Sequence, residues 1–203
     1  MHQKPLRTQV LTTLALTALL LAQTKAIIPL PGGQKLGDLQ PFCLFPEVWE
    51  SSLKPVSQVI DPIRYRGLWY ELARLPNSFQ EECVCSNAEY SLQPLRIGVY
   101  NTCYGVSGRI VDDASGFAIP TNAQSSKLKV YFNIFGGNYW ILDIGDSYDY
   151  GYVMVGEPCR DFLWILSRTK ELPEGKMVEL LKKARRLGFE TDNMVARSPA
   201  AYC

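Results

Sequence analysis

The stretch that decides the fold is "YRGLWYELARLPNSFQEECVC", residues 65–85. Its first part, "GLWYELARL" at 67–75, is rich in the aromatic and apolar residues that strands favour. Pro76 and Asn77 end that run, and a C-x-C at Cys83 and Cys85 follows two glutamates. Taken alone, the segment is compatible with a metal or redox site, a catalytic site or the beginning of a scaffold. The rest of the chain has to decide between these.

Seven further strand-like runs follow at close spacing, with turn residues between them. They cover residues 85–93, 96–104, 107–120, 127–135, 138–145, 150–156 and 161–168. Eight short strands with hairpin-length links indicate an all-β antiparallel sandwich or barrel. We favour an up-and-down β-barrel, because closing the sheet removes both exposed edges.

The C-terminal part changes to a helical period. In "LPEGKMVELLKKARRLGF" (172–189), apolar residues recur at helical spacing, and basic residues crowd the last turns, where the helix dipole favours them. We therefore expect one amphipathic α-helix packed on the barrel wall.

The N-terminus has the pattern of a secretory signal. His2, Lys4 and Arg7 precede the apolar run at 10–22, and small residues end at Ala26. The run is too short to span a membrane comfortably, so we expect cleavage of residues 1–26. Because no cysteine lies near that site, we expect a secreted or lumenal protein, whether extracellular, periplasmic or in an organelle lumen, and not a lipoprotein. Residues 27–62 are rich in Pro and Gly and predict an irregular arm, followed by the barrel with its helix and tail at 63–203.

Charge and histidine content exclude several function classes. Signal removal leaves 18 Lys and Arg against 20 Asp and Glu, with no polybasic run, so we expect no nucleic-acid partner. The chain's one histidine, His2, is lost with the signal. The mature chain therefore cannot run a Ser-His-Asp or Cys-His mechanism, nor build a His-containing catalytic zinc site. We expect no metal, no cofactor and no catalytic residues.

Six cysteines remain after cleavage, at positions 43, 83, 85, 103, 159 and 203. An even number behind a signal peptide predicts three disulfides in an oxidising compartment. The spacing alone leaves fifteen connectivities open.

Three segments together resemble the lipocalin family. "YRGLWYELARLPNSFQ", "DSYDYGYVMVGEP" and "DFLWILSRT" resemble the family's three sequence blocks, in order, within residues 60–197. The second block departs from the family pattern, because no Thr precedes Asp146. The resemblance implies an eight-stranded barrel around a calyx. It gives Gly67, Trp69 and Arg168 structural roles, with Trp69 closing one end of the barrel and Arg168 lying across the Trp69 ring. The chain is most similar to the branch of apolipoprotein D, bacterial lipocalins and plant (plastid) lipocalins.

The same resemblance suggests the disulfide pairing. It implies Cys43 with Cys159 and Cys85 with Cys203, while Cys83 with Cys103 is similar to an extra plastid-type pair. Which of Cys83 and Cys85 takes which partner stays open.

Strand alternation gives the candidate wall of the calyx. Ala88, Tyr90 and Leu92 share one face, as do Ile97, Val99 and Asn101, and Leu128, Val130 and Phe132. The family's pocket positions fall on Tyr90, Asn101, Phe132 and Trp164. Our predicted ligand-binding set is Tyr90, Leu92, Val99, Asn101, Val130, Phe132, Trp140 and Trp164. The alternative is that these side chains fill the barrel as core.

We expect residues 76–82 at the open end of the barrel, with Phe135, Tyr139 and Trp140 at its rim. Such apolar residues favour transient membrane contact or weak dimerisation of an otherwise monomeric protein, or belong to a plain hydrophobic hairpin.

The resemblance implies non-catalytic carriage of a fatty acid, lysophospholipid, sterol or carotenoid-like ligand, with a protective role against oxidised lipid. The alternative is a lipocalin-fold isomerase that uses a pocket thiol. That enzyme needs a free cysteine, which three disulfides would not leave.

Overall fold

A computed structural model describes residues 53–132, 134 and 136–197. The predicted signal peptide and most of the predicted arm lie outside these residues. Residues 53–61 are irregular, and a short helix, α3 (Pro62–Tyr65), follows them. The Asp61 side chain accepts a hydrogen bond from the Ile63 amide, and Pro62 takes the first helical position, so both residues set the helix start.

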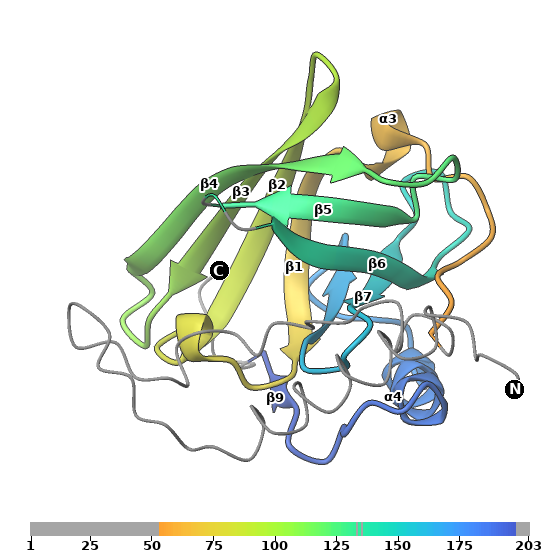
Figure 1. The fold of residues 1–203 in the computed structure, drawn as a ribbon. Coiled ribbons are helices and arrows are strands. Elements are labelled where there is room, and N and C mark those ends of the chain that lie inside the picture. The colour runs from red at the N-terminus through yellow and green to blue at the C-terminus, as the bar shows by residue number, and fades with distance from the viewer. Residues whose placement is uncertain (1–52, 133, 135, 198–203) are drawn as a thin grey trace, which may run out of the picture. The chain divides into compact units, whose positions relative to one another are not determined.

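The predicted antiparallel barrel is confirmed (Figure 1). Neighbours pair in the order β2-β3-β4-β5-β6-β7-β8-β1, and pairing between β2 and β1 closes the ring. The eight strands are β1 (Gly67–Arg74), β2 (Cys85–Gln93), β3 (Arg96–Tyr104), β4 (Ile110–Pro120), β5 (Lys127–Tyr131), β6 (Gly136–Ile144), β7 (Tyr152–Gly156) and β8 (Leu163–Ser167).

Three short elements were not predicted from the sequence. They are α3, the 3-10 helix η1 (Ser78–Gln80) between β1 and β2, and β9 (Val195–Ala196), which pairs with the end of β1. Each is only two to four residues long, too short for a hydrophobic period to be visible.

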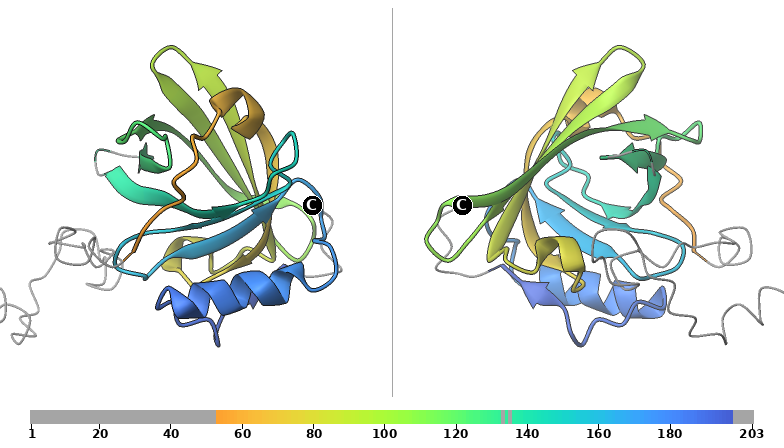
Figure 2. Two further views of the ribbon diagram at one scale, coloured as in Figure 1. Left: turned by 90° about the vertical axis from the view of Figure 1, so that its right-hand side faces the viewer. Right: turned by 60° about the vertical axis from the view of Figure 1, so that its left-hand side comes forward.

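The helix α4 (Lys176–Arg186) packs on the outside of the barrel, as expected (Figure 2). Its buried residues Leu180 and Ala184 belong to an apolar cluster with outward side chains of the barrel strands. Lys183 adds an ion pair to Asp143 on β6, with a distance of 2.8 Å between Nζ and the carboxylate oxygen. Among the described residues, no helix has the length and apolar character that crossing a membrane would require.

The prediction that Trp140 faces the calyx is wrong. Trp140 lies in the outer cluster with α4, while its neighbours Tyr139 and Ile141 belong to the interior cluster. Successive residues of a strand point to opposite faces, so an inward Tyr139 places Trp140 outside. The prediction that Tyr139 forms part of the rim is wrong for the same reason, and Phe135 lies outside the described residues.

The disulfide between Cys83 and Cys103 is confirmed, with a Cα–Cα distance of 5.2 Å. Cys85 and Cys159 are also disulfide-bonded. Cys43 and Cys203, which we expected as their partners, lie outside the described residues. The C-x-C motif therefore belongs to the disulfide framework and is not a thiol pair.

Candidate ligand-binding site

The interior of the barrel is lined mainly by apolar side chains. Tyr90, Val99, Val130 and Trp164 of the predicted set lie in its hydrophobic cluster. The β2–β3 register pairs Tyr90 with Val99 and Ala88 with Asn101, so the inward rows of both strands lie side by side. The inward faces of β2 and β3 are therefore the ones that strand alternation predicts.

A cavity of about 230 Å³ extends from interior residues such as Leu128 to the exposed Leu95. Its wall is apolar, and it lies at the end of the barrel formed by the β2–β3 and β4–β5 turns. The lining residues are Ile60, Pro62, Tyr65, Leu92, Gln93, Leu95, Arg96, Ile97, Pro120, Ser125, Leu128 and Ile141. Leu92, another predicted ligand residue, is 44% exposed and lies at the rim of this cavity.

The guanidinium of Arg96, the one charged side chain of the cavity lining, lies on the outer side of the sheet. Its Nε donates to the Gln93 side chain at 2.7 Å, and its guanidinium lies 4.7 Å from the centroid of the Phe117 ring. Phe117 faces outward on β4, because its neighbour Ala118 belongs to the interior cluster. The cavity therefore offers an apolar environment to a ligand.

Three tyrosine hydroxyls meet inside the barrel, from α3, β2 and β6. The Tyr139 hydroxyl is 2.6 Å from that of Tyr65 and 2.9 Å from that of Tyr90. Burial raises the pKa of all three phenols, that of Tyr90 to about 12. The phenols therefore remain protonated at neutral pH and act as neutral hydrogen-bonding groups. We call these three residues the tyrosine triad.

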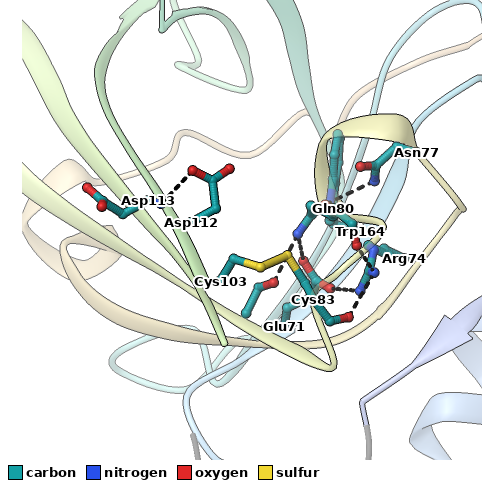
Figure 3. The surroundings of a disulfide bond; sticks show 10 residues. Glu71, Arg74, Asn77, Gln80, Cys83, Cys103, Asp112, Asp113 and Trp164 are labelled. Carbon is teal, nitrogen blue, oxygen red and sulfur yellow. Dashed lines mark hydrogen bonds and ion pairs between the residues drawn. A yellow bond between two sulfur atoms is a disulfide. The ribbon is translucent and has the colours of Figure 1, made fainter. Parts of the chain in front are cut away.

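The loop between β1 and β2 covers the opposite end of the interior, which we had expected to be open. Gln80 of this loop accepts a hydrogen bond from the Trp164 indole at 3.1 Å and donates to Glu71 at 2.7 Å (Figure 3). Phe79 adds a ring contact with Trp164, with centroids 6.4 Å apart. Trp164 thus faces the interior but is covered by this loop.

A buried ion pair lies beneath that loop. An Arg74 nitrogen is 2.8 Å from a Glu71 carboxylate oxygen, and both side chains are at most 7% exposed. Burial raises the Glu71 pKa, and the nearby Arg74 charge opposes that rise. Arg74 also donates to the backbone carbonyls of Gln80 and Cys83, so the pair anchors the loop (Figure 3).

Two predicted ligand residues occupy polar or exposed positions. Asn101 has a buried side-chain oxygen, Oδ1, with no hydrogen-bond partner in the described part of the chain. Phe132 follows β5 and is 43% exposed. Its ring lies against Gly116, where an added Cβ would come within 2.7 Å of it. A glycine at that position leaves room for the Phe132 ring.

Trp69 and Arg168 close the barrel beside β1. The Arg168 guanidinium lies 3.8 Å from the centroid of the Trp69 ring, and Trp69 is fully buried. The Trp69 indole donates to the Tyr65 carbonyl at 2.8 Å. Gly67 has φ +92°, a conformation that a side chain would strain, where the chain turns from α3 into β1.

The described residues contain no group of three or more His, Cys, Asp or Glu side chains arranged to hold a metal ion. A second cavity, of about 320 Å³, lies outside the interior cluster beside the Cys83–Cys103 disulfide. Its lining includes Glu81, Glu82 and Asp112.

Sequence reasoning missed two parts of this site. Tyr65 precedes the first strand, where no alternation pattern applies, and the Glu71–Arg74 pair lies at a bulge in β1. A signal for the ion pair was present, because two opposite charges occur within an otherwise apolar strand.

Comparison with known proteins agrees with this geometry. A family model described as a lipocalin-like domain matches residues 60–199. The putative lipocalin R877 of Acanthamoeba polyphaga mimivirus is 37% identical over 145 residues, which cover 67% of this chain and 83% of the viral protein. Apolipoprotein D of Macaca fascicularis is 35% identical over 136 residues, covering 63% of this chain and 70% of the relative.

A solved structure shows the same fold. Insecticyanin from the tobacco hornworm Manduca sexta superimposes with a TM-score of 0.55 at 22% identity, over 73% of this chain and 86% of that protein. At this identity, the similarity supports the fold alone.

The comparisons correct the predicted localisation. Outer membrane lipoprotein Blc of Vibrio cholerae is 33% identical over 147 residues, covering 71% of this chain and 85% of the bacterial protein. Our prediction excluded a lipoprotein, and lipoproteins among the relatives contradict it. The absence of a cysteine near residue 26 was too weak a basis for that exclusion.

Proposed function

Because this chain belongs to the lipocalin family, we propose that its barrel binds and carries a small hydrophobic or amphipathic ligand. The apolar cavity of about 230 Å³ at the end of the barrel formed by the β2–β3 and β4–β5 turns is the observation that carries this proposal. Binding of small hydrophobic ligands in the barrel is typical of the family, and an apolar cavity with few polar groups is the usual form of such a site.

The proposed wall combines apolar side chains with a few polar ones. Leu92 lines the cavity, and Tyr90, Val99 and Val130 belong to the adjoining interior cluster. Asn101 provides a buried amide whose oxygen has no partner in the described residues. Fatty acids, lysophospholipids, sterols and carotenoid-like molecules have the required apolar character. A protective role against oxidised lipid would use the same binding.

We propose that the binding is non-catalytic. The alternative, an isomerase, would need a free thiol in the pocket. The four cysteines of the described residues, Cys83, Cys85, Cys103 and Cys159, are all disulfide-bonded. We also propose a monomer or weak dimer that contacts membranes transiently near Phe132 and Ile134, which are 43% and 86% exposed.

The test is a titration with the neutral fluorescent probe N-phenyl-1-naphthylamine, using a variant that fills the cavity. Ile97 lines the cavity and packs against the interior cluster, whereas Tyr100 on the same strand faces outward and is 40% exposed. We expect Ile97→Trp to weaken probe binding at least about tenfold, because the indole occupies cavity space. Tyr100→Trp should leave binding unchanged.

Two results would contradict the proposal. One is a folded wild-type protein, stripped of lipid by organic extraction, that takes up no probe. The other is a folded Ile97→Trp variant with wild-type affinity. If that variant does not fold, displacement of the probe from the wild type by unlabelled 1-dodecanol, a neutral amphipathic competitor, decides, since a specific site is saturable.

A further inference from the structure

The tyrosine triad has one more hydrogen-bond donor than it can use. Three hydroxyls carry three protons, and the two hydrogen bonds that join Tyr65, Tyr139 and Tyr90 use two of them. If Tyr139 accepts both bonds, its own proton is unused; if it donates one, the hydroxyl that accepts it has the unused proton. Every arrangement therefore leaves one O–H group without an acceptor among the described residues.

One member of the triad, Tyr65, lines the apolar cavity. When Tyr139 donates to Tyr65, the surplus proton is on the Tyr65 hydroxyl. A buried donor without an acceptor is unfavourable, and most such groups in proteins have a partner. A ligand atom that accepts a hydrogen bond would provide it.

We propose that the triad is a hydrogen-bond donor subsite for a neutral acceptor, such as a ketone or ester carbonyl, at the inner end of an apolar ligand. This inference rests on the proposed function and specifies the ligand class.

A neutral group fits better than a carboxylate. Two cations lie near this site, and neither is directed at the triad. Arg96 is stacked on the outward-facing Phe117, and the Arg168 guanidinium lies on Trp69 and donates to backbone carbonyls, including that of Tyr65. A carboxylate at the triad would therefore lose its hydration without a direct hydrogen bond from a cation. The raised pKa values of the phenols, caused by burial, keep all three hydroxyls in the donor form.

The experiment compares a matched pair of probes and a matched pair of variants. The probes are 2-undecanone and undecane, competing with N-phenyl-1-naphthylamine. The test variant is Tyr65→Phe/Tyr90→Phe/Tyr139→Phe, which removes the three hydroxyls and keeps the rings. The control variant is Tyr100→Phe/Tyr131→Phe/Tyr148→Phe, which removes three hydroxyls outside the barrel interior.

We expect the test variant to lose about tenfold in affinity for the ketone and to bind undecane as the wild type does. The control variant should bind both probes normally. In the infrared spectrum, the carbonyl band of the ketone bound to the wild type should lie at lower wavenumber than in hexane. That shift should disappear in the test variant.

Failure of this inference is distinguishable from failure of the proposed function. If the ketone binds the wild type and its carbonyl band matches that in hexane, the donor subsite is wrong and apolar binding survives. Equal ketone affinity in the wild type and the folded test variant would overturn the donor subsite in the same way. If neither probe displaces the fluorophore, both proposals fail. The wild-type infrared band needs no variant, so the test holds even if the test variant does not fold.

Discussion

Arg168 holds the segment that precedes β1 against the end of the barrel. Its planar guanidinium stacks on Trp69, 3.8 Å from the ring centroid. The same group donates hydrogen bonds to five backbone carbonyls, those of Arg64, Tyr65, Arg66, Leu68 and Asp149. A guanidinium can serve several acceptors in its plane while its face lies on a ring, whereas an ammonium group cannot.

We therefore expect Arg168→Lys to destabilise the protein by about 2–4 kcal/mol although the charge is kept. Urea unfolding followed by tryptophan fluorescence measures this loss. Arg185→Lys is the control, because Arg185 is 57% exposed and makes an ion pair with the exposed Asp192. A stability loss of the same small size in both variants would mean that charge alone matters at Arg168.

The loop between β1 and β2 is fastened to the barrel at two places. The Cys83–Cys103 disulfide joins its end to β3, and the Gln80 amide bridges Glu71, Ser86 and Trp164. These partners come from β1, β2 and β8, so one side chain connects the loop to three strands. Removing Gln80 would leave a buried carboxylate oxygen and an indole N–H without their partners.

We expect Gln80→Ala to lower stability by about 2–3 kcal/mol and to increase amide hydrogen exchange most strongly in residues 76–84. The matched control is Gln93→Ala at the end of β2, where the exposed Gln93 bonds to Arg96. Uniform acceleration of exchange over all strands of Gln80→Ala would contradict a local role for this contact.

Strand β6 shows where sequence reasoning reached its limit. The eight strands followed from short apolar runs between turn residues, the wall helix from its helical period, and the inward rows of β2 and β3 from alternation. In β6, Tyr139, Trp140, Ile141 and Leu142 are all apolar or aromatic, because the interior and α4 bury both faces. Alternation carries no information in such a run. Only the structure shows that Tyr139 faces the interior and Trp140 faces α4.

The same two-sided burial divides the whole barrel. In β7, Val153 faces the interior and Met154 faces α4. In β8, Leu166 faces the interior and Ile165 faces α4. The outer face of β2 to β4 is more open, as the exposed Tyr100 and Ile119 show. The cavity lies toward the strands without helix cover, next to the tyrosine triad. The three phenols are buried in the folded chain and exposed to water in the unfolded chain, so their pKa values differ between the two states. Their protonation therefore affects the free energy of unfolding.

We expect this effect to destabilise the protein at alkaline pH. Unfolded tyrosine has a pKa of 10.0, while burial raises the pKa of Tyr90 to about 12 and also raises those of Tyr65 and Tyr139. Between these values, the folded chain binds more protons than the unfolded chain, so stability falls as pH rises. For Tyr90 alone, the loss is about 1.4 kcal/mol at about pH 11.

Urea unfolding at about pH 9 and about pH 11 tests this. The wild type should lose at least about 1.4 kcal/mol more over this range than the Tyr65→Phe/Tyr90→Phe/Tyr139→Phe variant, in which these three phenols are absent and cannot titrate. The Tyr100→Phe/Tyr131→Phe/Tyr148→Phe control should follow the wild type. If the wild type and the triad variant lose the same free energy, the triad phenols do not govern alkaline unfolding. Other titrating groups of the chain would then have to account for it.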